Sequence, residues 1–246
     1  MARKVINTLA GLFALALCAW PSTAGATPST QIWIPSTDTQ PFGTVHLGVD
    51  NYTTVFKKIE DGGHALPVTM GVTVGAADTS VIGAEIGVDL REPTDDPLYL
   101  NAKLQIKEDS LFGFFPAVAV GGYDFGTKSG TTDYNIFYLE MAKTLAPVGR
   151  FAVGYYVGND TLLRDASGNK ENDGVLLSFD RVMAEINNKL WFGIDYMGGQ
   201  NVYGSLNFGI SWRFSPNISA ILGYDVYNER KLAGEDTVTI QFDIDF

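Results

Sequence analysis

The chain has 246 residues, of which 46% are hydrophobic and only 18% are charged. About a quarter of the residues are charged in a typical soluble domain, and a disordered chain has far fewer apolar residues than this one. Beyond the N-terminal stretch, no segment has the run of about 20 apolar residues that a membrane-spanning helix needs. These proportions leave all-β architectures, soluble or embedded in a membrane, as the leading class.

The first 26 residues have the features of a secretory signal peptide. Arg3 and Lys4 form a basic start, residues 9–20 are apolar, and residues 24–26 form a cleavage site of small residues. The alternative is an N-terminal membrane anchor. Cys18 is the only cysteine, and no small residue precedes it as a lipoprotein signal would require, so we expect it to leave with the signal peptide.

Charge and composition exclude several functions for the mature chain, which would begin near Thr27. Without the first 26 residues, 15 basic and 28 acidic residues remain, a net charge of −13. This charge argues against a nucleic-acid partner. Two histidines without a cysteine argue against a zinc site. The sequence contains no phosphate loop and no dinucleotide fingerprint, so we expect no cofactor.

Apolar and polar residues alternate with the period of a β-strand through the rest of the chain. In residues 98–107, for example, Leu100 and Leu104 fall on one face and Lys103 and Lys107 on the other. On this basis we expect strands at residues 43–56, 64–75, 79–91, 97–107, 115–125, 132–144, 149–158, 174–187, 189–198, 201–214, 217–228 and 236–246. The count is about twelve, within a range of ten to fourteen, and an even number is favoured. A change of phase within residues 174–187 suggests a bulge.

The connections between these strands alternate between short turns and longer, more charged loops. The longest is the loop at 159–173, and the connection EDSLFGF is longer than the alternation predicts. Outer-membrane barrels have short periplasmic turns and longer outside loops. We therefore expect a closed, antiparallel, up-and-down transmembrane β-barrel over residues 43–246, with both termini on the short-turn side.

Three features indicate that the apolar face of each strand points outward to lipid. The polar face is rich in glycine, which suits the concave side of a barrel, and it carries charges of both signs that a lumen can pair or hydrate. The strands are also about as long as a bilayer crossing requires, and a closed barrel leaves no unpaired backbone edge in lipid.

The last strand has the sequence TVTIQFDIDF and ends the chain on an aromatic residue. It resembles the C-terminal signal of Gram-negative outer-membrane β-barrel proteins, a porin-like class. The resemblance implies an integral outer-membrane location and recognition of Phe242, Ile244 and Phe246 by the barrel-assembly machinery. The segment IWIPSTDTQPFGTVHLGVDNY looks like the start of poorly characterised barrel proteins, which implies little about activity. Outer-membrane lipid is the other expected partner, and the oligomeric state stays open.

If the apolar face meets lipid, charged residues of both signs line the lumen. The predicted lumen residues are Asp50, Glu85, Asp89, Arg91, Lys103, Lys107, Arg150, Glu185, Asp195, Arg213, Asp225 and Asp243. Such charges either orient a small hydrated solute or pair completely and stabilise a closed barrel. Eight strands are filled by side chains, whereas 16–18 leave an aqueous channel. Twelve strands therefore predict a narrow porin-like channel for passive diffusion of small solutes or ions, with a slight cation preference from the acidic excess.

Two other functions compete with the channel. The barrel could be a non-transporting structural protein, surface anchor or adhesin, with the 159–173 loop as its contact surface. It could also be a lipid-modifying enzyme, since some twelve-stranded barrels are phospholipases that use a histidine and a serine. His46 and His64 lack an evident nucleophile partner, so we expect no enzymatic activity. The loop sequence DASGNKENDG resembles a calcium loop only superficially, because its glycine and glutamate are misplaced.

The mature N-terminal segment at residues 27–42 precedes the first strand and contains three prolines. We expect it on the periplasmic side. There it could dock under the barrel or fold into it as a partial plug.

Overall fold

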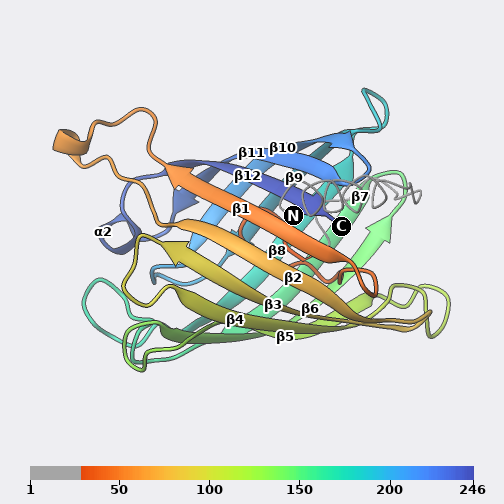
Figure 1. Ribbon diagram of the computed structural model, residues 1–246, viewed down its shortest axis with the longest axis horizontal. Coiled ribbons are helices and arrows are strands. Elements are labelled where there is room, and N and C mark those ends of the chain that lie inside the picture. Colours follow the sequence, from red (N-terminus) through yellow and green to blue (C-terminus); the bar gives the residue numbers. More distant parts are fainter. Residues whose placement is uncertain (1–28) are drawn as a thin grey trace, which may run out of the picture.

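The computed structural model describes residues 29–246, so the predicted signal peptide and Cys18 lie outside the described residues. Twelve antiparallel strands follow one another around a closed barrel, and β1 completes the ring by pairing with β12 (Figure 1). The strands are β1 (Val45–Thr53), β2 (Val68–Asp78), β3 (Ile82–Glu92), β4 (Leu98–Ile106), β5 (Ala117–Gly126), β6 (Asp133–Leu145), β7 (Gly149–Val157), β8 (Asp173–Val182), β9 (Leu190–Met197), β10 (Ser205–Ser215), β11 (Ile218–Tyr227) and β12 (Thr237–Asp245). The predicted fold class and strand count are confirmed.

Two short helices lie in the connections of the described chain, η1 (Ile59–Asp61) and α2 (Arg230–Ala233). No helix within residues 29–246 is long and apolar enough to cross a membrane.

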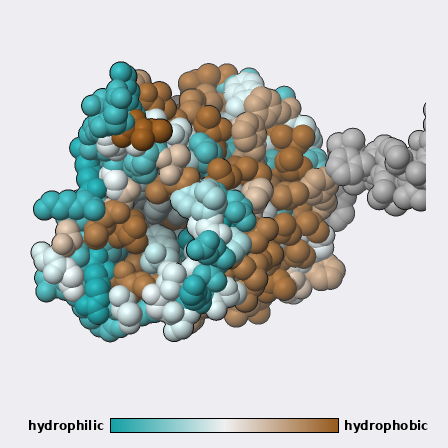
Figure 2. All heavy atoms as spheres, turned by 60° about the vertical axis from the view of Figure 1, so that its left-hand side comes forward, coloured by the Kyte–Doolittle hydropathy of each residue, from teal (hydrophilic) through white to brown (hydrophobic). Residues whose placement is uncertain are grey.

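Alternation along each strand separates an apolar outer wall from a polar interior. In β4, the outward Leu100 and Leu104 are more than half exposed, whereas the inward Lys103 and Gln105 are buried. On the face seen in Figure 2, apolar side chains cover the outer wall, and hydrophilic residues gather at one end. An exposed apolar surface of this kind is stable only against an apolar solvent. It therefore supports the prediction that the apolar face of each strand points outward to lipid.

The two ends of the barrel carry different connections (Figure 1). We call one the loop end, where residues 54–67, 93–97, 127–132, 158–172, 198–204 and 228–236 connect the strands. The other is the turn end, where the connections are mostly short. Residues 107–116 are the longest connection at the turn end. They contain EDSLFGF, the connection that is longer than the alternation of short turns and long loops predicts. The C-terminal Phe246 also lies at the turn end, where its backbone exchanges two hydrogen bonds with Val45.

Two strands differ from their predicted form. β8 ends at Val182, and residues 183–189 form the connection to β9, so the change of phase expected to be a bulge is the end of the strand. In β5, the pairing register shifts on both sides near Asp124, whose φ of 57° lies in the left-handed region. With this bulge both Tyr123 and Asp124 point inward: the Tyr123 hydroxyl contacts Met197 of β9 across the lumen, and Asp124 pairs with Arg91 of β3 on the same wall.

We call residues 29–42 the inner segment. Its residues 31–40 lie inside the barrel, whereas Pro41 and Phe42 at its end are exposed. Ile32 and Ile34 are at most 2% exposed. The backbone N–H of Ile32 donates to Asp195 of β9, and the side chain of Gln241 in β12 donates to the Ile32 carbonyl. Of the two arrangements that the sequence left open, the structure shows the segment folded into the barrel.

An apolar cluster fills part of the lumen between the inner segment and the wall. It contains Ile34, Ile136 and Tyr138 of β6, Leu176 of β8, and Leu163 of the connection 158–172. This cluster explains why β6 is apolar on both faces: its outer face meets lipid, and its inner face packs against the inner segment. It also shows that the long loop folds inward at Leu163.

Candidate functional site

A cavity of about 140 Å³ lies between the inner segment and the wall formed by β1 to β4. The inner segment borders it through Ser29, Thr30, Trp33 and Pro35. The surrounding wall contributes His46, Gly48, Asp50, Thr69, Gly71, Thr73, Glu85, Asp89, Asn101, Ala102, Lys103, Gly122, Tyr123, Tyr138 and Asp243. The cavity follows β1 over the inward positions from His46 to Asp50, and it is the best candidate for a functional site.

Glycines on the wall create the space of the cavity. Gly48 and Gly71 pair directly across β1 and β2. A Cβ atom at Gly71 would approach Asp89 Oδ1 to 2.6 Å, so the glycine makes room for this carboxylate. A Cβ atom at Gly48 would have only His46 Nε2 within 4 Å, at 3.6 Å. The wall at Gly48 therefore faces open space.

Most charges around the cavity are paired. Lys103 Nζ lies 3.0 Å from Glu85 Oε1, and both side chains are about 4% exposed. The ring nitrogens of His46 lie 3.4 Å from Asp243 and 2.8 Å from Asp245. These contacts engage Lys103 and His46, the basic groups that line the cavity.

Two carboxylates on the same wall have no cationic partner within ion-pair distance among the described residues. Asp89 accepts a hydrogen bond from the Asn101 side chain at 2.9 Å. Asp50 forms no hydrogen bond and no ion pair with any described residue. Because the lining bases are already engaged, Asp50 and Asp89 give this side of the lumen an excess of negative charge.

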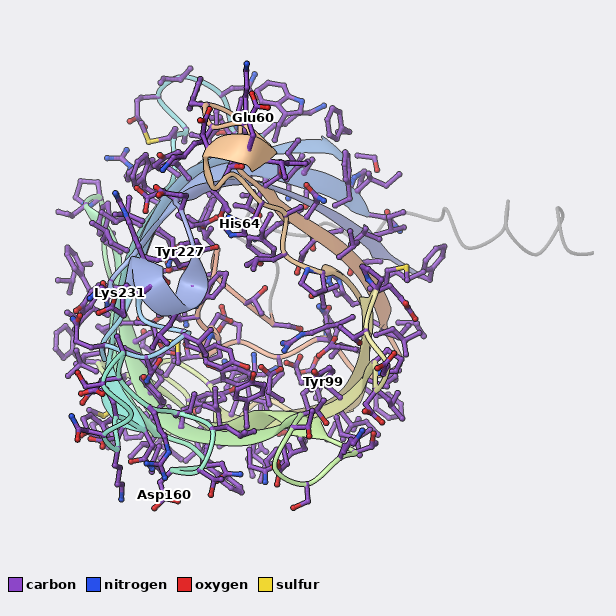
Figure 3. All side chains as sticks on the ribbon, turned by 90° about the vertical axis from the view of Figure 1, so that its left-hand side faces the viewer. Glu60, His64, Tyr99, Asp160, Tyr227 and Lys231 are labelled. Atoms are coloured by element: carbon purple, nitrogen blue, oxygen red, sulfur yellow. The ribbon has the colours of Figure 1, made fainter. Side chains whose placement is uncertain are left out.

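Toward the loop end, an aromatic collar narrows the lumen around Arg91. Arg91 Nη2 lies 2.5 Å from Asp124 Oδ1, and the Tyr203 hydroxyl donates to the other carboxylate oxygen, Asp124 Oδ2. The Arg91 guanidinium stacks over the Tyr99 ring at 4.3 Å, a cation–π contact. The Trp33 ring packs at 5.7 Å from the ring of Tyr227. Figure 3, seen from the loop end, shows Tyr99 and Tyr227 on opposite sides of the barrel.

Nine of the twelve predicted lumen residues lie inside the barrel and contact the cavity, the collar, the inner segment or neighbouring buried groups. They are Asp50, Glu85, Asp89, Arg91, Lys103, Arg150, Asp195, Asp225 and Asp243. Arg213 lies on the inward face of β10 near the turn end and is half-buried.

The remaining two predicted lumen residues lie at the turn end. Lys107 follows the end of β4 and forms an ion pair with Asp78 at the rim. Glu185 is a correction: it belongs to the connection 183–189, its side chain is 52% exposed, and it pairs with Arg181 at 2.7 Å. The prediction that Glu185 lines the lumen failed because β8 ends three residues before it.

Several interior residues escaped the sequence reasoning. Asp38 pairs with Arg150, but no local pattern predicts that the inner segment enters the lumen. Asp124 lies in the β5 bulge, which breaks the alternation. Glu140 and Asp180 lie on the inward faces of β6 and β8. Alternation would have predicted both residues if the inward face of each strand had been assigned. Glu140 is fully buried, and its two carboxylate oxygens have no hydrogen-bond partner among the described residues.

The site gives no support to the enzyme alternative. Both ring nitrogens of His46 face carboxylates, so neither is left to activate a nucleophile. His64 lies between the loops at the loop end, and its ring nitrogens have no hydrogen-bond partner among the described residues.

The described chain also contains no group of three His, Cys, Asp or Glu side chains that could hold a metal ion. In the loop with the superficial calcium pattern, the Asp165 carboxylate instead accepts hydrogen bonds from Ser167 and Asn169.

No protein-family model and no curated protein matches the chain. Among solved structures, a KdgM porin superposes with a TM-score of 0.53 at 9% identity, over 82% of this chain and 99% of that chain. A KdgM porin in complex with disordered oligogalacturonate gives a TM-score of 0.52 at 9% identity, with the same coverage. A third structure, from work on in-meso crystallization of membrane proteins, gives 0.50 at 11% identity over 83% of each chain. The chain therefore has a porin-like barrel fold.

Proposed function

We propose that this chain is a narrow channel of the outer membrane that allows passive diffusion of small hydrated solutes and ions. One observation carries the proposal: a closed barrel with an apolar outer wall encloses a polar cavity beside β1 to β4. A protein with this wall has its stable place in a bilayer, and a polar interior gives hydrated solutes a route past the lipid. The narrow cavity limits that route to small solutes.

The charge around the cavity supports a preference for cations. Asp50 and Asp89 face the cavity without a basic partner, whereas Lys103 is held by Glu85. One of the similar structures is in complex with oligogalacturonate, a chain of sugar acids. The same excess of carboxylates would repel such a polyanion here, so we do not transfer that ligand to this chain.

This proposal places the protein in the outer membrane of a Gram-negative bacterium, with the loop end outside and the turn end in the periplasm. Its partners would be outer-membrane lipid and the barrel-assembly machinery. A transporter of this kind needs no catalytic residues, which agrees with the arrangement of His46 described above.

The competing function is a barrel that conducts nothing. The observation in its favour is the apolar cluster around Ile34 and Leu163, which fills part of the lumen. Such a filled barrel would serve as a structural or surface-anchoring protein.

Planar-bilayer recording of the refolded protein separates the two functions. The channel predicts discrete conductance steps, and a reversal potential in a KCl gradient that shows K⁺ to be more permeant than Cl⁻. Absence of steps at every salt concentration would contradict the channel and favour the structural barrel. Steps with a preference for Cl⁻ would keep the channel and contradict the cation preference.

A further inference from the structure

Polar contacts along its length hold the inner segment in the lumen. At its start, the N–H groups of Ile32 and Trp33 both donate to Asp195, at 2.8 and 3.0 Å. Gln241 donates to the Ile32 carbonyl at 2.7 Å. Because these bonds satisfy backbone groups that are shielded from water, the segment has a defined seat inside the barrel.

Two basic side chains of the wall hold the rest of the segment. Arg150 of β7 donates to Asp38 Oδ1 at 2.9 Å and also contacts Thr37. Lys103 of β4 donates to the carbonyl oxygens of Ser29, at 2.8 Å, and Asp38. The segment is thus tied to strands on both sides of the lumen.

The wall behind the segment is shaped to receive it. A Cβ atom added at Gly209 or Gly223 would lie 3.3 Å from the side chain of Ile32. One at Gly83 would lie 2.1 Å from Thr39 Oγ1, and one at Gly75 would lie 1.9 Å from the Pro41 carbonyl. The wall has glycines at four places where the segment comes close, so the barrel and the segment fit as one structure.

The segment also forms one side of the cavity, through residues such as Trp33 and Pro35. A twelve-stranded barrel lies between the filled eight-stranded and the open 16-stranded cases. With small residues on the wall behind the segment, the space it occupies would join the cavity if the segment left.

From these contacts we propose that the inner segment is a built-in constriction that sets the size limit of the barrel. The inference rests on the proposed channel function and adds that the N-terminal residues, rather than the strands alone, determine which solutes pass. The solutes admitted by the intact chain are small and hydrated, and the barrel without the segment admits larger ones.

Deleting residues 29–40 tests this inference, because residues 41–43 and their hydrogen bond to Gly75 stay in place. Bilayer conductance is measured for both proteins, together with swelling of liposomes in arabinose and in the trisaccharide raffinose. We expect the deletion to raise conductance roughly twofold or more and to admit raffinose, which the intact chain excludes. Equal conductance and equal sugar limits would overturn the constriction and leave the channel standing.

The remaining outcomes separate the two proposals. If the deletion variant conducts and the intact chain does not, the result would support the constriction and contradict the channel function of the intact chain. No conductance in either folded protein would overturn both.

A point variant keeps the test decisive if the deletion prevents folding. Ile34→Asp places a charge in the apolar cluster, where Ile34 is fully buried, and should displace the segment without altering any strand. Phe42→Asp is the matched control, because Phe42 is 72% exposed. We expect Ile34→Asp to admit raffinose and Phe42→Asp to behave as the wild type. Identical sugar limits in all three proteins would overturn the proposal.

Discussion

Glu85 and Glu140 are both buried glutamates of the lumen, but their surroundings differ. Glu85 pairs with Lys103 and accepts hydrogen bonds from Ser29 and the Gln40 N–H. The carboxylate oxygens of Glu140 accept no hydrogen bond among the described residues. Removing a buried charge that has ion-pair and hydrogen-bond partners leaves those partners unsatisfied and lowers stability. Neutralising a buried charge that has no such partners removes the cost of burying it.

This difference predicts opposite effects on stability. Glu85→Gln should lower the free energy of unfolding by about 3 kcal/mol, because it leaves the Lys103 ammonium without its counterion. Glu140→Gln should leave stability unchanged or raise it. Urea titrations in detergent micelles, followed by tryptophan fluorescence, measure both. Equal destabilisation by the two variants would show that Glu140 has a partner equivalent to that of Glu85.

The two unpaired carboxylates predict the charge preference of the channel. Asp50→Asn removes a negative charge that faces the cavity, so the K⁺ over Cl⁻ permeability ratio should fall by roughly half or more. Asp78→Asn removes the same charge at the turn-end rim, where the carboxylate already pairs with Lys107, and serves as the control. Reversal potentials in a KCl gradient report the ratio. The role of Asp50 would be refuted if the two variants lost the same amount of selectivity.

Residues whose position follows from local alternation can be predicted from the sequence. Asp50, Glu85 and Lys103 were placed in the lumen because each stands in a strand of constant phase. Asp124 was missed because a bulge with a left-handed residue breaks that phase. The pairing of Asp38 with Arg150 joins residues far apart in the sequence, and alternation contains no information about such a contact.

At the scale of elements, the strands could be predicted, whereas the sequence left open whether the N-terminal segment docks under the barrel or folds into it. Every one of the twelve predicted strands has its counterpart, because the period of two repeats throughout the wall. The apolar inner face of β6 was the visible sign of an apolar partner in the lumen. Identifying that partner as the inner segment required the three-dimensional structure.

The end of β12 leads to a prediction about assembly. Phe246 closes the barrel by exchanging backbone hydrogen bonds with Val45, while its side chain is 42% exposed. Phe246→Ala preserves those backbone bonds and removes the aromatic group proposed to be recognised by the assembly machinery. We expect less folded protein in the outer membrane of expressing cells, and unchanged refolding of purified protein in detergent.

Heat-modifiable migration on gels measures the folded fraction in both settings. Leu222→Ala, at a lipid-facing position of β11 that is more than half exposed, is the matched control. A normal amount of folded Phe246→Ala protein in cells would show that assembly does not depend on the aromatic side chain of Phe246.

At the scale of the whole molecule, the chain builds three concentric parts: an apolar outer band, a wall of twelve strands and an inner segment with a polar cavity beside it. The outer band determines where the protein is stable. The cavity and the inner segment together determine what passes. The central claim is that solutes travel through the cavity along β1 to β4.

Single-channel conductance of Gly48→Trp compared with Val49→Trp tests this claim most directly. Gly48 faces the open cavity, whereas its neighbour Val49 faces lipid and is 37% exposed, so both variants add the same indole group on opposite sides of one strand. We expect Gly48→Trp to abolish most of the conductance and Val49→Trp to retain the wild-type value. Wild-type conductance in a correctly folded Gly48→Trp protein would contradict it.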